Sequence, residues 1–351
     1  MHEPLLEIRD LAVHFPIRRG GFLSKQVGTV KAVDGVSLSI EKGKTLSLVG
    51  ESGCGKSTTV LALLGMAPLT RGSVRFKGEP IDLTNSRSLF QFRRQAQMIF
   101  QDPFGSLNPR MRVCDIIAEP LRIHMPQMRK EQREERVRDL MGYVGLLPTM
   151  AERYPHEFSG GQRQRIGVAR ALSLNPELVI CDESVSALDV SIQAQVLNLL
   201  MDLQDELGLT YIFVSHDLAV VRHISHRIAV MYLGQIMELA DKEGLYRMPK
   251  HPYTQALLSA IPIADPVAEA QRQRIKLGSE IQSVINVPSG SASIRDALMP
   301  GRSARVPCRQ RKKTTTAIRW PVTSTVTPTG KESHCSCSVQ AATGVAVAEL
   351  A

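Results

Sequence analysis

A glycine-rich segment carries residues whose types and spacing suit phosphate binding. Glycines let consecutive backbone N–H groups turn toward phosphate oxygens, and a following helix adds the positive end of its dipole. Lys56 can reach the β- and γ-phosphates of a nucleotide, and the Ser57 hydroxyl can ligate Mg²⁺. The segment consists of Gly50, Glu51, Ser52, Gly53, Cys54, Gly55, Lys56, Ser57 and Thr58. An apolar run at 45–49 and a helix-prone run at 59–64 flank it, which predicts a nucleotide-binding P-loop rather than a chance turn.

Two adjacent carboxylates, Asp182 and Glu183, follow the apolar residues 178–181. A buried strand there would bring Asp182 to the carboxyl edge of a sheet, where ligands of α/β folds bind. Asp182 suits direct or water-mediated binding of Mg²⁺. Glu183 could polarise an attacking water as a general base. The P-loop upstream strengthens this interpretation.

Three more candidates end predicted strands. His216 follows the apolar residues 211–214 and is predicted to contact a γ-phosphate, although a lone histidine is more often structural. Gln101 follows residues 97–100 and could reach Mg²⁺ or water. Phe15 ends the first predicted strand and could stack on adenine, the alternative being a core aromatic.

The segment Ser159, Gly160, Gly161 and Gln162 precedes a helix-prone run. A serine and two glycines at the start of a helix can bind a phosphate. They can equally be an N-cap with a tight entry into the helix. The residues alone leave both interpretations open.

The elements that must position these residues alternate between apolar strands and helices. Further strands are predicted at 5–15, 30–40, 73–76 and 227–232, and helices at 162–172 and 192–207. Such alternation implies a largely parallel sheet covered on both faces. Residues 18–29 are predicted to be an exposed loop. Residues 113–147 are predicted to be a helical subdomain whose charged run is a solvated face.

Composition and charge restrict the class of protein. The chain has 351 residues, 43% of them hydrophobic, and no run approaches the roughly 18 apolar residues of a membrane span. Without signal-peptide features, and with six cysteines in no pairing pattern, a cytosolic protein with reduced thiols is expected. Residues 291–351 hold nine Lys/Arg and three Asp/Glu and so carry +6 of the net charge of +9. Residues 1–290 therefore carry only +3, without a strong basic stripe, which argues against nucleic acid as a partner. His334, Cys335 and Cys337 cannot close a tetrahedral metal site by themselves.

Together these motifs resemble the ATP-binding subunits of ABC transporters over about residues 4–290. Six motifs occur in that family's order: the P-loop, Gln101, the signature at 159–162, the pair Asp182 and Glu183, a D-loop at 186–189 and His216. Further segments resemble the dipeptide/oligopeptide (and nickel) importers and the "F" subunit of their paired ATPases: 18–29, 101–103, 106–110, 119–121, 154–158, 186–195 and His251-Pro252-Tyr253-Thr254.

The resemblance implies an α/β fold, a P-loop NTPase ABC nucleotide-binding domain with an antiparallel β subdomain and a helical subdomain. The ATPase domain would span 1–240, with the helical subdomain at about 103–172, and a C-terminal extension would span 241–290. The implied cofactors are ATP and Mg²⁺, with the metal held by Ser57, Gln101 and Asp182. Glu183, His216 and Gln101 would be catalytic.

The resemblance also implies partners. A second ATPase subunit, homologous or identical, would form a head-to-tail dimer in which residues 159–162 and Asp189 of one subunit bind the nucleotide on the other's P-loop. Two transmembrane permease subunits and an extracytoplasmic solute-binding protein would complete a di-/oligopeptide importer at the cytoplasmic face of the plasma membrane. Nickel or glutathione import is the related alternative. A soluble ABC ATPase acting on nucleic acid or ribosomes is the alternative of another class.

Two departures from the family pattern stand out. Ser184 occupies a position that is usually proline, which should loosen the turn without removing a catalytic group. After Gly290 the family continues with a stretch like CRFHTRCPHA, whereas residues 292–300 read ASIRDALMP. The family stretch RFHTRCPHA could be encoded by the codons CGC TTC CAT ACG CGA TGC CCT CAT GCC. Read from the second base, the same codons encode ASIRDALMP. We hypothesise a base lost near Ser291, which would make 291–351 an aberrant, disordered tail, and the coding DNA would then encode a cysteine-rich peptide in another frame.

Overall fold

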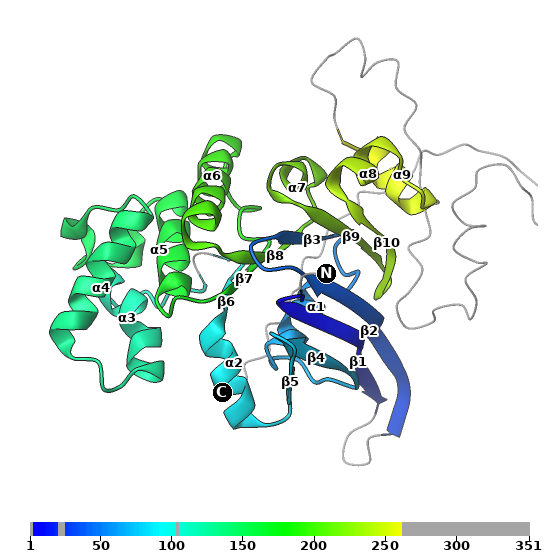
Figure 1. Ribbon diagram of the computed structural model, residues 1–351, viewed down its shortest axis with the longest axis horizontal. Helices are drawn as coiled ribbons and strands as arrows, with labels where there is room; N and C mark the ends of the chain where they lie inside the picture. Colours follow the sequence, from blue (N-terminus) through cyan, green and yellow to red (C-terminus); the bar gives the residue numbers. More distant parts are fainter. Residues whose placement is uncertain (1–2, 20–24, 103–104, 262–351) are drawn as a thin grey trace, which may run out of the picture. The chain divides into compact units, whose positions relative to one another are not determined.

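The computed structural model describes residues 3–19, 25–102 and 105–261, and two β-sheets are the frame of its fold (Figure 1). The larger sheet has the strand order β10-β9-β3-β8-β7-β6. Its strands are β3 (Thr45–Val49), β6 (Ala96–Ile99), β7 (Leu178–Asp182), β8 (Thr210–Ser215), β9 (Arg227–Tyr232) and β10 (Gln235–Asp241). Neighbours run parallel except β10, which pairs antiparallel with β9. The predicted largely parallel sheet is confirmed.

The smaller sheet is antiparallel, with the order β2-β1-β4-β5. Its strands are β1 (Leu6–Arg19), β2 (Lys25–Ile40), β4 (Arg71–Phe76) and β5 (Glu79–Ile81). The loop predicted at 18–29 is wrong at both ends, because β1 and β2 stay paired from Pro16 opposite Thr29 to Arg19 opposite Lys25. Backbone hydrogen bonds between two strands do not depend on side-chain polarity, so a polar, Gly-containing segment can still form a hairpin.

The helices are α1 (Lys56–Leu63), α2 (Ser86–Gln95), α3 (Val113–His124), α4 (Lys130–Tyr143), α5 (Gly160–Leu172), α6 (Val190–Leu207), α7 (Leu218–Ile224), α8 (Lys242–Arg247) and α9 (Pro252–Ser259), with 3₁₀ turns at Pro148–Met150 and Pro155–Glu157. The helices predicted within 113–147, at 162–172 and at 192–207 are confirmed. In the described part of the chain, no helix has the length and hydrophobicity needed to cross a membrane.

Apolar side chains cover both faces of the larger sheet. In β8, Tyr211 and Phe213 belong to one hydrophobic core and Ile212 and Val214 to the other, and all four are buried. Helices α3 to α7 pack into the first core, and α1, α2 and the smaller sheet pack into the second. Figure 1 shows α3, α4 and α5 gathered at one end of the larger sheet. The parallel strands β3, β8 and β7 lie side by side, so their carboxyl ends form one edge, to which the candidate residues are attached.

Candidate functional site

The P-loop joins the end of β3 to the start of α1. Gly55, the residue before α1, has a φ of 106°, and a Cβ atom there would lie 2.2 Å from the carbonyl oxygen of Ala32. Only glycine tolerates both the backbone conformation and the close approach of β2. The turn opens toward the edge of the sheet, with Ser52 and Gly53 exposed and Cys54 buried beneath them.

Lys56 lies inside this turn with only 4% of its side chain exposed. Its ammonium group donates to the carbonyl oxygens of Gly50 and Glu51, at 2.9 Å each. It also lies 3.8 Å from the Glu183 carboxylate. The Cys54 sulfur lies 4.0 Å from the same ammonium. A buried ammonium held mainly by two carbonyl oxygens and one carboxylate is well placed to exchange the carbonyls for phosphate oxygens.

Ser57 and Asp182 meet at the predicted metal position. The Ser57 hydroxyl donates to a carboxylate oxygen of Asp182 at 2.9 Å. Burial raises the pKa of Asp182, and the hydrogen bond from Ser57 opposes that rise. Hydroxyl and carboxylate oxygens are ligands that Mg²⁺ accepts, usually together with water and substrate phosphates. Across the described ranges no cluster of three or more His, Cys, Asp or Glu side chains could hold a metal. Ser57 and Asp182 supply two of the six oxygen ligands that Mg²⁺ takes, so water and phosphate oxygens would have to supply the others.

Glu183 brings the predicted catalytic residues together. One of its carboxylate oxygens accepts a hydrogen bond from the Gln101 amide at 2.9 Å, and the other lies 3.5 Å from Nδ1 of His216. Glu183 is 13% exposed and His216 is 55% exposed, so the cluster opens to solvent on the histidine side. The side chains that follow β6 and β8 thus converge on the carboxylate that follows β7, beside Lys56.

The signature residues take up the N-cap geometry. The Ser159 hydroxyl accepts from the N–H of Gln162 at 3.3 Å, and the Gln162 side chain accepts from the N–H of Ser159 at 3.0 Å. This is a capping box at the start of α5. Gly160 and Gly161 form its first turn, and Asp189 is the exposed N-cap residue of α6.

The structure does not bring every predicted residue to the P-loop. Within the described chain, no recorded hydrogen bond or ion pair joins the signature or Asp189 to the P-loop or to the Glu183 cluster. Phe15 is 37% exposed on β1, so the alternative that it is a core aromatic is wrong. Cys54, Cys114 and Cys181 are free thiols, as expected, whereas the other three cysteines and the predicted tail lie outside the described residues.

Two site-related residues have no predicted role. Arg170 on α5 donates to the carbonyl of Ser106 at 2.6 Å and lies over the Phe100 ring, which ties α5 to residues on both sides of Gln101. Tyr253 on α9 accepts from the backbone N–H of Glu51 in the P-loop. In the sequence, Tyr253 belongs to the segment at 251–254, which resembles the importer family but does not by itself indicate a contact with the P-loop.

Comparison with known proteins gives the same picture. The family described as "ABC transporter" matches residues 33–186, and "Oligopeptide/dipeptide transporter, C-terminal region" matches residues 237–290. The oligopeptide transport ATP-binding protein AppF of Bacillus subtilis is 56% identical over 289 residues, 82% of this chain and 87% of AppF. The glutathione import ATP-binding protein GsiA of Pectobacterium atrosepticum is 52% identical over 283 residues, 81% of this chain and 45% of GsiA.

Solved structures agree on the fold. The dimeric structure of a post-hydrolysis state of the ATP-binding cassette MJ0796, bound to ADP and Pi, has a TM-score of 0.59 and 26% identity. The structural match covers 68% of this chain and 98% of the MJ0796 chain. The fold and the P-loop site define an ABC-type nucleotide-binding ATPase domain. The chain belongs to the ABC transporter family of ATP-binding proteins, as its motifs predict.

Proposed function

We propose that this chain binds MgATP, hydrolyses it, and thereby energises the import of di- and oligopeptides. The observation that carries the proposal is the convergence of Gln101, His216 and Lys56 on the Glu183 carboxylate beside the P-loop. Similarity to AppF, an oligopeptide transport ATP-binding protein, supports the substrate class.

The contacts in the site suggest how each residue acts. Lys56 would exchange the carbonyl oxygens of Gly50 and Glu51 for the β- and γ-phosphates, while the loop N–H groups from 50 to 58 cradle them. Ser57 and Asp182 would hold Mg²⁺, with Gln101 reaching it or the attacking water. The metal would neutralise charge on the phosphates.

Glu183 would accept the proton of the attacking water as general base. Gln101 and His216 fix the direction of its carboxylate from two sides, and His216 would also contact the γ-phosphate. Phe15, exposed on the neighbouring sheet, would stack on adenine.

A second subunit would complete the site. We infer a head-to-tail dimer with an identical or homologous ATPase, in which Ser159, Gly160, Gly161, Gln162 and Asp189 act on the partner's nucleotide. The capping box leaves the first N–H groups of α5 at a helix N-terminus, where an anion is stabilised. The signature therefore offers a phosphate site that residues of its own P-loop do not use.

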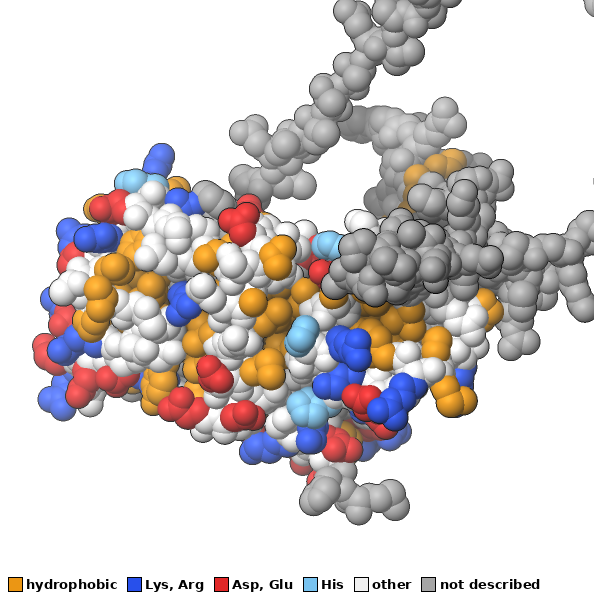
Figure 2. All heavy atoms as spheres, turned by 90° about the horizontal axis from the view of Figure 1, so that it is seen from above, with side chains coloured by type: hydrophobic (Ala, Val, Ile, Leu, Met, Phe, Trp, Pro, Cys, Tyr) orange, Lys and Arg blue, Asp and Glu red, His pale blue; other side chains and the backbone are white. Residues whose placement is uncertain are grey.

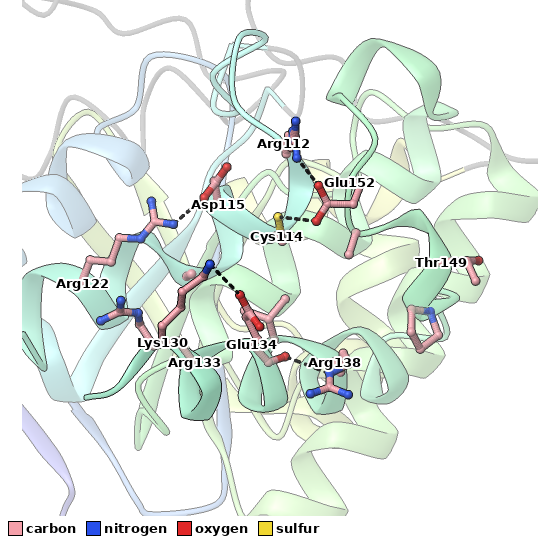
Figure 3. A pocket seen from close by; sticks show the side chains of 14 residues that line it. Arg112, Cys114, Asp115, Arg122, Lys130, Arg133, Glu134, Arg138, Thr149 and Glu152 are labelled. Carbon is pink, nitrogen blue, oxygen red and sulfur yellow. Dashed lines mark hydrogen bonds and ion pairs between the residues drawn. The ribbon is translucent and has the colours of Figure 1, made fainter.

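Two transmembrane permease subunits and an extracytoplasmic solute-binding protein are the further proposed partners, at the cytoplasmic face of the membrane. A cavity of about 510 Å³ between α3, α4 and residues 148–152 supports a docking site for a permease segment (Figure 3). Its rim carries ion pairs of Arg112 with Glu152 and of Arg122 with Asp115. The bond from Arg170 to Ser106 lies just before α3, so a shift of the Gln101 segment would reach this cavity.

Glutathione or nickel import, and an ATPase activity directed at nucleic acid, are the alternative functions. Similarity to GsiA favours glutathione import as the second candidate, with nickel import as its relative. An ATPase acting on nucleic acid is less well supported, because Lys and Arg side chains on the face seen in Figure 2 lie among Asp and Glu side chains.

The test is uptake of labelled di- and oligopeptides by cells that carry the gene, its deletion or Glu183→Gln, with Glu206→Gln on the exposed surface of α6 as the matched control. Loss of the general base should lower ATP hydrolysis by at least about 100-fold while ATP stays bound. Peptide uptake should fail in the deletion and in Glu183→Gln only. Loss of glutathione or nickel uptake instead would favour the second candidate, and wild-type hydrolysis by Glu183→Gln would refute the assigned role.

A further inference from the structure

The segment His251-Pro252-Tyr253-Thr254 reaches the P-loop from the C-terminal end of the described chain. Tyr253 is fully buried, and its hydroxyl oxygen accepts a hydrogen bond of 3.3 Å from the backbone N–H of Glu51. Its ring packs on Tyr232 at the end of β9, with ring centres 4.6 Å apart. Burial raises the pKa of Tyr253, so the hydroxyl stays neutral at physiological pH.

Hydrogen bonds at the start of α9 position the Tyr253 side chain. Glu238 on β10 accepts hydrogen bonds from the backbone N–H groups of Lys250 at 2.9 Å and His251 at 3.0 Å. Burial raises the pKa of Glu238, but the nearby Thr254 side chain and the hydrogen bonds from these two N–H groups outweigh it, so the pKa is lowered overall. His251 then caps α9 by accepting from the N–H of Tyr253 at 3.1 Å.

The contact falls where the P-loop binds its own lysine. Glu51 donates its N–H to Tyr253 and accepts with its carbonyl from the ammonium of Lys56 at 2.9 Å. A second C-terminal contact lies nearby, because the N–H of Gly234 donates to the carbonyl of Cys54 at 2.9 Å. Tyr253 and Gly234 therefore hold the loop at two backbone positions, Glu51 and Cys54.

We propose that Tyr253 is a positioning residue for ATP, whose hydroxyl fixes the P-loop through the Glu51 amide. The C-terminal segment thereby sets the affinity of the loop for the nucleotide phosphates. This inference rests on the proposed function of the P-loop as an ATP site. The proposal assigns the segment at 251–254 a role in the nucleotide site, although the P-loop at 50–58 is far from this segment in the sequence.

The test replaces only the hydroxyl. Tyr253→Phe keeps the ring and its packing on Tyr232. The matched control is Tyr246→Phe on α8, whose hydroxyl donates to the Leu218 carbonyl and makes no recorded bond to the P-loop. The full chain is titrated with MgATP, and KM and kcat for hydrolysis are measured separately. Thermal unfolding of both variants reports folding.

Tyr253→Phe leaves the Glu51 N–H without its partner, so the Kd and KM for MgATP should rise about 3- to 30-fold while kcat changes by less than about twofold. Tyr246→Phe should leave both constants unchanged. A merely structural role would instead lower kcat and stability at constant KM, and that result, like an unchanged Kd, would overturn the proposal. If the wild-type chain bound no MgATP, the proposed function itself would fail.

Discussion

Replacing Gly161 by alanine tests whether the signature is shaped by packing as well as by phosphate binding. A Cβ atom at Gly161 would lie 2.4 Å from Cγ2 of Ile192 on α6. At the neighbouring Gly160 it would lie 3.5 Å from Leu188, an ordinary van der Waals contact. The two substitutions therefore add the same methyl group in the same helical turn. The methyl group of Gly161→Ala would clash with Ile192, whereas that of Gly160→Ala would be accommodated beside Leu188.

The comparison isolates the cost of the collision. Alanine gains roughly 0.5–1 kcal/mol over glycine in a helix, and this gain applies to both variants. Ile192 is β-branched and lies in the first turn of α6, so its Cγ2 cannot rotate away without leaving its preferred rotamer. Overpacking of this kind costs about 1–3 kcal/mol. Gly161→Ala should therefore unfold about 2–10 °C below Gly160→Ala.

Calorimetry or urea unfolding of the two variants gives the difference directly. Adding Ile192→Ala to Gly161→Ala removes the colliding methyl group and should recover most of the loss, whereas it should destabilise Gly160→Ala. Equal stability of the two single variants, within about 0.5 kcal/mol, would refute the packing argument. ATPase activity then reports the phosphate role, because Gly160→Ala should lose activity without losing stability.

Two further outcomes follow from the described contacts. Gly55→Ala places a methyl group 2.2 Å from the Ala32 carbonyl at a φ of 106°, so soluble yield should drop sharply and urea unfolding should show a loss of more than about 2 kcal/mol. Burial raises the pKa of Glu177, but Lys77 and Lys42 outweigh it and the pKa is lowered. Its carboxylate therefore adds stability that is fully present above the unfolded-state pKa and is lost as pH falls through the lower folded-state pKa. The gap in urea midpoint between wild type and Glu177→Gln should therefore narrow on going from pH 7 to pH 4, and a gap that widens would contradict this.

The strands and helices that the sequence predicts correctly are those in which burial imposes a pattern. Residues 211–214 and 178–181 are continuous apolar runs because both faces of their strands lie in a core. Helix α2 lacks such a pattern, since only Leu89 and Phe92 of its ten residues are buried, and no helix is predicted there. Its N-cap, Asn85, accepts from the N–H groups of Arg87 and Ser88, a local signal that polar composition obscures.

In the candidate site, too, some residues can be predicted from the sequence and others depend on tertiary packing. Gln101, Glu183 and His216 are predictable because each follows a parallel strand, and parallel strands end at one edge. The contact of Tyr253 with Glu51 spans 202 positions, and no periodicity in either segment indicates it. The need for glycine at 161 likewise depends on the packing of α5 against α6, which the order of residues in one helix does not reveal.

The turn after β7 shows why the departure at Ser184 is compatible with activity. Glu183 has a φ of 45°, and its backbone N–H donates to the Val214 carbonyl at 3.0 Å. Its carbonyl accepts from both the N–H of Ser186, at 3.1 Å, and the hydroxyl of Ser186, at 2.9 Å. These bonds fix the residue that carries the carboxylate, and a proline at 184 would contribute none of them. Ser184 is itself buried at 2% exposure, so packing restricts the turn in place of a ring. The direction of the carboxylate toward Gln101 and His216 is therefore set by the backbone of β8 and the D-loop.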